Sequence, residues 1–528
     1  MDALANAVIL SWGWRRRGLA FGAGAISALA QPPFFAFPLL WLTFPVLVWL
    51  IDGAAGQTRS GRARRFLPAF SVGWWFGFGY FLAGLWWVGA AFLVEADVFG
   101  WLMPLAVLGL PAGLALFWGL GAVAAQLLWS EDWRRIFALA AGLGGAEWLR
   151  GALFGGFPWN SIGYALTAGE VLMQSASLFG LHALSVLAVL VFAAPAAMAP
   201  AGHRQERHIA LPLLGLTFLA ALGLYGFMRL HAVETAFAKD TTIRIVQPAL
   251  DQLQKWRPEN RDEVLRTYLD LSAPGDAPLP PGTVLVWPES AFPFALTDDP
   301  EALSSIAALL SPGTALVTGA YRVENDPSGE RRVFNSMYVI GDDGTILDAY
   351  DKTHLVPFGE YLPAGDMLSA IGLRQLVQDG FSAGPRRRSL NLPFAPPFTP
   401  LICYEAIFSG AVLGEGPRPG FLINVTNDGW FGRTIGPHQH FHQARIRAVE
   451  EGLPMIRAAN TGISAIIDGH GRVSARSRLG EAVMLETRLP TAIAPTFYSK
   501  WRSNLVSILL VACLLTAGSG ILYPAYRL

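Results

Sequence analysis

Three residues in the long polar stretch between residues 236 and 500 carry side chains suited to acyl-transfer chemistry. Cys403 supplies a thiol, Glu289 a carboxylate and Lys352 an amine. The thiolate is the nucleophilic form of cysteine, and a free thiol is only partly ionised at neutral pH. We therefore expect Cys403 to attack an acyl carbonyl, Glu289 to move the thiol proton and Lys352 to stabilise the oxyanion.

Each of these three residues comes just after a short run of β-type residues. The runs cover 283–287, 345–350 and 398–402. Residues at the carboxyl ends of strands can converge on one site although they lie far apart in sequence. Taken singly, Glu289 is also typical of a turn or N-cap, Lys352 of a solvated ion pair with Asp351, and Cys403 of a core thiol. Their joint occurrence favours the catalytic interpretation.

The stretch that holds these residues has the pattern of a mixed α/β domain. β-type runs occur at 242–246, 283–287, 314–318, 334–340, 345–350, 398–402, 421–425, 455–458 and 463–467. Helical segments are predicted at 257–272, 300–310 and 438–451. Turns at 341–344 and 468–471 predict hairpins. A domain of this length is large enough to bury its own core.

The composition of the chain indicates a membrane protein. Of 528 residues, 53% are hydrophobic and 15% are charged, against a usual charged share of about 25%. Apolar stretches that could cross a ~30 Å hydrocarbon layer lie near 33–51, 66–93, 99–129, 170–199, 209–230 and 504–523, with shorter ones near 18–31 and 135–154. We expect about eight transmembrane helices, seven within 1–235 and the last within 501–528, which flank a catalytic domain at 236–500.

Charged residues between these stretches predict the orientation. Basic residues gather at 15–17, 59–65, 134–135 and 203–207, whereas the alternate connections carry only Arg150. By the positive-inside rule the basic side is cytoplasmic, so the domain at 236–500 is expected on the outer face. The segment 18–31, which follows three arginines, also resembles a cleavable signal peptide. A retained helix is favoured because the leading segment is long and the run is Gly-rich.

Charge and cysteine content exclude other classes of protein. The formal net charge is zero, and no basic stretch interleaved with aromatic residues predicts a nucleic-acid partner. The two cysteines cannot form a disulfide framework, and Cys513 lies in an apolar run as a small hydrophobe. His438, His440 and His442 could be read as metal ligands, but at this spacing they do not share one helical face. No metal and no cofactor is expected.

Several motifs carry a resemblance to a known family. Trp287-Pro-Glu-Ser290, Tyr350-Asp-Lys352 with Pro357-Phe-Gly-Glu360, and Ile402-Cys-Tyr-Glu405 resemble the three catalytic motifs of the nitrilase superfamily, in the same order. With spans on both sides, the chain resembles the apolipoprotein N-acyltransferases. These membrane enzymes transfer an acyl chain from a phospholipid to the amino group of a lipoprotein's diacylglyceryl-cysteine. Further similar stretches are 147–150, 156–159, 424–432 and 457–464.

The resemblance implies a polytopic helical membrane protein that carries a nitrilase-like αββα sandwich. It implies that Glu289, Lys352 and Cys403 form the catalytic triad. It also implies a protein of the bacterial inner membrane whose catalytic domain lies in the periplasm. The supporting residues that it implies are Glu360 as a second carboxylate near the lysine, Tyr404 and Glu405 beside the nucleophile, and Trp256 in a strand-to-helix connection. Two alternatives stay open, since Trp256 could only pack a loop and Glu405 could be a surface cap.

A phospholipid donor would need a cleft that opens toward the bilayer. Phe358, Tyr361, Leu362 and the stretch 367–377 could form an apolar lid over it or pack on the domain. The basic run 386–388 could contact headgroup phosphates, although a solvated loop is the simpler interpretation.

The sequence leaves two other functions open beside N-acyl transfer. A membrane-anchored amidase or nitrile hydrolase would use the same triad with water as the acceptor. A transporter or scaffold with an inactive domain is less favoured, because the spans hold few charges, chiefly Glu147 and Arg150.

Overall fold

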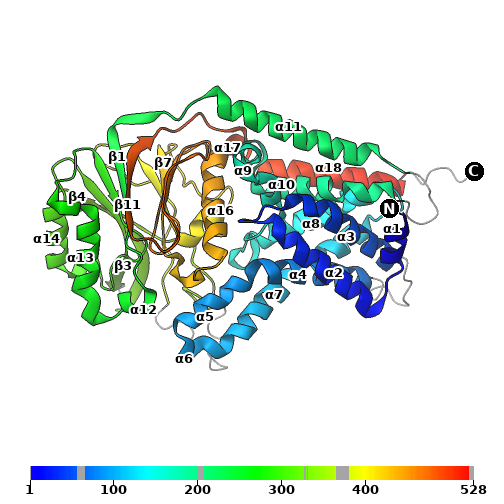
Figure 1. The fold of residues 1–528 in the computed structure, drawn as a ribbon, viewed down its shortest axis with the longest axis horizontal. Coiled ribbons are helices and arrows are strands. Elements are labelled where there is room, and N and C mark those ends of the chain that lie inside the picture. Colours follow the sequence, from blue (N-terminus) through cyan, green and yellow to red (C-terminus); the bar gives the residue numbers. More distant parts are fainter. Residues whose placement is uncertain are drawn as a thin grey trace, which may run out of the picture. The chain divides into compact units, whose positions relative to one another are not determined.

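The computed structural model describes residues 2–55, 66–199, 207–325, 329, 331–363 and 380–522. The chain forms two compact units (Figure 1). A helical unit comprises Met1–Val233 and Thr496–Leu528, and an α/β unit comprises Glu234–Pro495.

The longer helices of the helical unit are α2 (Gly13–Ser27), α3 (Leu40–Ala55), α4 (Leu67–Leu85), α7 (Met103–Leu127), α8 (Arg135–Arg150), α10 (Ala176–Ala193), α11 (Ala210–Ala232) and α18 (Ser503–Leu522). Among the described residues, five helical stretches are long and apolar enough to cross a membrane: Phe37–Ala55, Leu67–Val94, Ala96–Leu127, Ala176–Met198 and Ala210–Ala232. A shorter apolar helix covers Ser503–Ser519. Since α2 and α8 have only 15 and 16 residues, the count of eight spans stays a prediction.

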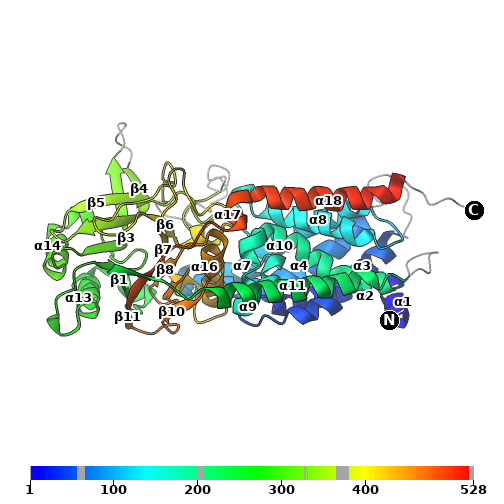
Figure 2. The ribbon, with the colours of Figure 1, turned by 90° about the horizontal axis from the view of Figure 1, so that it is seen from above.

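Small residues let these helices approach one another closely. At Gly24, Gly73 and Gly142, an added Cβ would clash with a backbone oxygen of a neighbouring helix. This use of glycine is typical of helix packing in membranes. The C-terminal helix α18 packs against α8 and α10, so the two ends of the chain build one bundle (Figure 2).

The two charges that the sequence placed inside the spans form a buried pair. Arg150 Nη2 lies 2.8 Å from Glu147 Oε2, and Trp118 Nε1 donates to Glu147 Oε1 at 2.7 Å. Arg150 also donates to the carbonyl of Trp159 at 2.9 Å. Through these hydrogen bonds the pair links α8 to α7 and to the loop that follows α8.

The α/β unit contains two sheets. The first has the order β11-β1-β2-β3-β4-β5 and the second β10-β9-β8-β7-β6. The strands are β1 (Phe237–Gln247), β2 (Thr283–Val286), β3 (Ala315–Asn325), β4 (Arg331–Gly341), β5 (Ile346–Asp351), β6 (Phe398–Ile402), β7 (Phe421–Thr426), β8 (Met455–Ala459), β9 (Ala465–Ile467), β10 (Val473–Arg476) and β11 (Val483–Pro490). Strands β1 to β3 are parallel, as are β6 to β8.

Apolar side chains from both sheets meet in one core, which includes Ile243, Val317, Phe398 and Ile456. Helices α13 (Arg261–Ser272) and α14 (Pro300–Leu309) cover the outer face of the first sheet through a second core. Helix α16 (Gly436–Glu451) covers the second sheet in the same way. The predicted αββα sandwich is therefore confirmed.

All nine predicted strands and all three predicted helices are present, although β1 begins well before the predicted run at 242–246 and β3 extends well beyond the run at 314–318. The hairpins are confirmed, since β4 pairs with β5 and β9 with β10 in antiparallel fashion. Strands β10 and β11 were missed because both have many exposed, polar positions.

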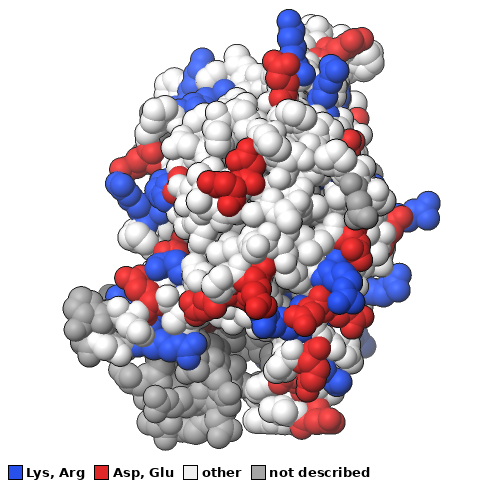
Figure 3. Space-filling model, turned by 90° about the vertical axis from the view of Figure 1, so that its left-hand side faces the viewer, with Lys and Arg blue, Asp and Glu red and all other residues white. Residues whose placement is uncertain are grey.

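The face drawn in Figure 3 carries acidic and basic side chains that are interspersed rather than gathered by sign.

Candidate active site

The three residues expected to do chemistry come from three different strand ends. Glu289 follows β2, Lys352 follows β5 in the same sheet, and Cys403 follows β6 at the edge of the other sheet. Lys352 Nζ lies 3.6 Å from Glu289 Oε1. The convergence that the sequence predicted is therefore present for the carboxylate and the amine.

These two residues belong to a buried group that we call the lysine cluster: Glu289, Asn335, Lys352 and Glu360. Lys352 Nζ donates to Glu360 Oε1 at 2.8 Å. Asn335, on β4, donates from one amide nitrogen to Glu289 at 2.8 Å and to Glu360 at 2.9 Å. Asp351 instead contacts Arg322, so the interpretation of Lys352 as the solvated partner of Asp351 is wrong.

The electrostatics of the lysine cluster suit proton transfer. Burial raises the pKa of Glu289, and Lys352 lowers it while Glu360 raises it further. Burial alone would lower the pKa of Lys352, but the carboxylates of Glu360 and Glu289 raise it above its ordinary value. Lys352 therefore stays a cation, and Glu289 has an increased affinity for a proton, as a general base that later acts as an acid requires.

Cys403 occupies a strained turn. It begins the 3-10 helix η13 (Cys403–Ile407) directly after β6, with a backbone φ of 47°, which is rare for a residue with a side chain. Burial raises the pKa of the Cys403 thiol, Glu289 raises it further, and Lys352 lowers it. Both charged groups thus influence the pKa of the thiol. Because this pKa is raised, the thiol stays protonated until a base removes its proton.

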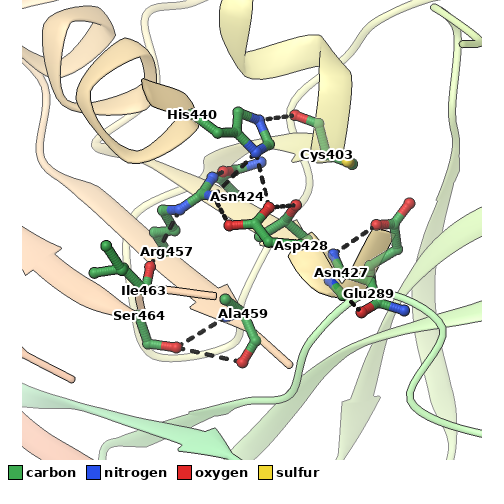
Figure 4. Close-up of polar contacts among 12 residues, drawn as sticks. Glu289, Cys403, Asn424, Asn427, Asp428, His440, Arg457, Ala459, Ile463 and Ser464 are labelled. Atoms are coloured by element: carbon green, nitrogen blue, oxygen red, sulfur yellow. Dashed lines mark hydrogen bonds and ion pairs between the residues drawn. The ribbon is translucent and has the colours of Figure 1, made fainter. Parts of the chain in front are cut away.

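A second buried group lies against Cys403, and we call it the histidine cluster: Asp428, His440 and Arg457 (Figure 4). His440 Nε2 lies 3.2 Å from the Cys403 carbonyl oxygen, which can only accept, so this nitrogen carries the hydrogen. Nδ1 of the same ring lies 2.8 Å from Asp428 Oδ1. Arg457 donates to Asp428 Oδ2 at 2.8 Å. The cluster holds the backbone of the strained turn.

The histidine cluster keeps its carboxylate ionised. Burial alone would raise the pKa of Asp428, but Arg457 and His440 outweigh burial and hold it at about 2. Burial lowers the pKa of His440. In the sequence, His440 stands out only as a candidate metal ligand beside His438 and His442. No group of three potential ligand side chains lies together in the described parts of the chain.

Asn427 connects the two sheets at the site. Its backbone N–H donates to Glu289 Oε2 at 2.9 Å, as Figure 4 shows. Its side chain donates to Gln252 at 2.7 Å. The loop after β7 in the second sheet therefore orients the carboxylate that belongs to the first sheet.

Glu405 is central to the site and not a surface cap, so that alternative is wrong. It is fully buried and accepts hydrogen bonds from the Ile402 N–H at 2.8 Å, the Thr353 N–H at 2.9 Å and the Tyr350 hydroxyl at 2.7 Å. Arg387 also donates to it, at 3.0 Å. Glu405 thus fastens the loop that follows Lys352 to the turn that holds the cysteine.

The remaining predicted residues lie at the margin of this group. Tyr404 is buried, with its ring 5.0 Å from that of Phe408. Trp256 is 41% exposed and stacks on Tyr321 with a centroid separation of 6.4 Å.

The proposed lid and the basic run have different outcomes. Phe358 is exposed, but the stretch 367–377 lies outside the described residues. Arg387 contacts Glu405, and Arg388 contacts Asp348 at 2.6 Å. The interpretation of 386–388 as a solvated loop is therefore wrong for Arg387, whose partner Glu405 is fully buried, whereas the side chain of Arg388 is 39% exposed.

Comparisons with known proteins show which family the chain resembles. Residues 23–194 match the family described as apolipoprotein N-acyltransferase N-terminal domain, and residues 276–492 match carbon-nitrogen hydrolase. A protein of Rhodopseudomonas palustris named apolipoprotein N-acyltransferase is 49% identical, over 95% of this chain and 94% of that protein. One of the same name from Bradyrhizobium diazoefficiens is 48% identical, over 97% and 96%. A solved CN-hydrolase superfamily protein of Xanthomonas campestris is 18% identical, over 55% of this chain and 99% of that one, with a TM-score of 0.33.

Proposed function

The chain belongs to the apolipoprotein N-acyltransferase family, and we propose that it transfers an acyl chain through a thioester on Cys403 to the amino group of a lipoprotein's N-terminal diacylglyceryl-cysteine. The observation that supports this mechanism is that Lys352 lies 3.6 Å from Glu289 and that both groups influence the pKa of the Cys403 thiol. A nucleophile with its own base and its own cation is suited to a covalent acyl intermediate.

In the first half-reaction the enzyme is acylated. Glu289 takes the thiol proton while the Cys403 sulfur attacks the ester carbonyl of a phospholipid. The carbonyl oxygen becomes an oxyanion, which Lys352 stabilises. The ester C–O bond then breaks, and Glu289 returns the proton to the leaving alcohol, so that a lysophospholipid departs and a thioester remains.

In the second half-reaction the lipoprotein amine attacks the thioester carbonyl. Glu289 accepts a proton from the attacking amine, the C–S bond breaks, and the sulfur of Cys403 recovers a proton. The product is an amide, and the free thiol is restored. Because the donor product leaves before the acceptor reacts, the kinetics are ping-pong.

The donor and the location of the site belong to the same proposal. A phospholipid is the acyl donor of the reaction that the resemblance implies, and the apolar stretches of the helical unit fit an enzyme whose substrates stay in a membrane. The charge alternation between spans supports an inner-membrane protein with its α/β unit in the periplasm.

The alternative is an amidase or nitrile hydrolase that uses the same three residues. The names of the similar proteins do not favour it. The two functions differ in the fate of the thioester, because a hydrolase must admit water and a transferase must exclude it.

The test is intact-protein mass spectrometry of the detergent-solubilised protein. With phospholipid alone, a covalent acyl adduct on Cys403 should accumulate and persist for many turnover times. Adding a diacylated lipopeptide should discharge the adduct and yield triacylated product. Rapid release of free fatty acid without an adduct, or turnover of small amides without a lipopeptide, would support the hydrolase instead.

A further inference from the structure

Lys255 is a buried lysine of the α/β unit. It ends the short helix α12 (Gln252–Lys255) and is 1% exposed. Within the described ranges its ammonium nitrogen has no hydrogen-bond partner. The other buried lysine and arginines of the α/β unit each contact a carboxylate: Arg244 with Glu486, Lys352 with Glu360, Arg447 with Glu450 and Arg457 with Asp428.

Such a group is costly for the protein to keep. Removing an ammonium from water without a counter-charge loses a large hydration free energy. The cost is visible in the pKa of Lys255, which burial lowers to about 8, while Glu289 offsets only part of the effect. A methionine would fill similar space without this cost, so the charge is better explained by an anionic group that arrives with a ligand.

Lys255 is tied to the active site. Gln252, on the same short helix, accepts a hydrogen bond from the side chain of Asn427, whose backbone N–H donates to Glu289. The ammonium of Lys255 lies 5.8 Å from the ring centroid of Trp256, a cation–π distance. It therefore sits beneath a half-exposed tryptophan and within the electrostatic reach of Glu289.

We propose that Lys255 binds the phosphodiester of the phospholipid donor while the donor's ester carbonyl lies at Cys403. This inference rests on the proposed function. Only the glycerol backbone separates the phosphate of a phospholipid from its scissile ester. The reacting end of the acceptor carries esters and an amine, and no phosphate. Lys352 contacts two carboxylates and is assigned to the oxyanion at the ester carbonyl, so the phosphodiester needs a different cation.

The test compares two acyl donors in the absence of lipopeptide. Phosphatidylglycerol in mixed micelles carries the phosphate, and p-nitrophenyl palmitate is an ester without one. The rate of adduct formation on Cys403, followed by intact-protein mass spectrometry, gives kcat/KM for each donor. The quantity of interest is the ratio of the two values, because a general loss of folding or of chemistry lowers both.

Lys255→Met should lower that ratio roughly 10- to 100-fold, as expected for the loss of a charge-assisted hydrogen bond, mainly through a higher KM for the phospholipid. Lys255→Arg should retain most of the ratio. Lys239→Met, which removes an exposed lysine of β1, is the matched control and should not change it.

Three results would overturn the inference. If Lys255→Met lowers both values equally, Lys255 acts on Glu289 or on folding. If it lowers neither, the charge has no role in donor binding. If Lys255→Arg lowers the ratio of the two kcat/KM values as much as Lys255→Met does, a positive charge is not what the donor requires. Failure of the unsubstituted protein to form an adduct with phosphatidylglycerol would instead overturn the proposed function.

Discussion

The lysine cluster and the histidine cluster are both buried and charged, yet they are balanced differently. In the histidine cluster one carboxylate faces one guanidinium and a ring whose pKa burial lowers, and the pKa of Asp428 falls to about 2. In the lysine cluster two carboxylates share one ammonium, and the pKa of Glu289 rises. A balanced group holds a geometry, whereas an unbalanced one can exchange a proton.

The same difference separates the two sheets. The first sheet supplies the groups that we expect to move protons and stabilise charge. The second supplies the nucleophile and the hydrogen bonds to its backbone. Asn427 is one link between the two, because its backbone N–H reaches from the second sheet to the carboxylate of Glu289 in the first.

The largest expected effect comes from removing the sulfur of Cys403, the nucleophile of the proposed reaction. Cys403→Ala should abolish acyl transfer, and Cys403→Ser should nearly do so, because an alkoxide is much harder to form than a thiolate. Transfer to a diacylated lipopeptide, followed by mass spectrometry, is the measurement. Cys513→Ala, in α18, is the control and should be almost silent. Substantial activity of Cys403→Ala would exclude the thioester mechanism.

The next effect tests the lysine cluster alone. Glu289→Gln removes proton transfer while keeping size, and Lys352→Met removes the charge while keeping length. Each should slow acylation of Cys403 by ~10²–10⁴, with expression and thermal unfolding close to those of the unsubstituted protein. Near-normal adduct formation in either variant would mean that its assigned role is wrong.

The histidine cluster should give a smaller loss of activity, since it acts through the backbone of Cys403. His440→Ala removes the donor to the Cys403 carbonyl and should slow acylation about 10- to 100-fold, in line with one hydrogen bond to a strained turn. His440→Gln can restore an N–H at the same place and should recover part of the rate. His438→Ala is the neighbouring control. Equal losses in the alanine and glutamine variants of His440 would contradict the positioning role.

The smallest effect is one of stability. The folded-state pKa of Asp428 is about 2, against an ordinary value of 3.8. Its ionised form therefore stabilises the fold fully above pH 4, and this contribution of about 2 kcal/mol is lost as the pH falls toward 2. Hydrogen exchange of β7 and β8 amides, corrected for the intrinsic rate, should show this loss.

Asp428→Asn supplies the comparison for that measurement. The variant is less stable at neutral pH, because Arg457 loses its counter-charge. Its β7 and β8 amides should respond less to acid between pH 4 and pH 2. An identical acid response in both proteins would show that Asp428 does not carry the effect.

Much of the α/β unit could be predicted because its signals are local. Nine strands, three helices and two hairpin turns follow from apolar runs and turn residues that lie next to one another in the chain. Strand β11 could not be found in this way, since its ladder depends on β1, more than two hundred residues earlier. The sequence could not decide whether Glu405 supports the nucleophile or caps a surface turn, and it favoured a solvated loop for Arg387. Both cases share one cause, because burial of a charge depends on partners from other loops.

The sequence by itself determined which chemistry is available: a thiol, a carboxylate and an amine, each placed after a strand, and apolar stretches on both sides of them. The tertiary structure decided which charges meet. It brought Asn335 between two carboxylates, set His440 against the carbonyl of Cys403, and left the ammonium of Lys255 buried without a hydrogen-bond partner among the described residues. The reason is physical: the type of a side chain is a local property, whereas its pKa and its hydrogen-bond partners depend on groups that only the folding of two sheets against each other brings within a few ångströms.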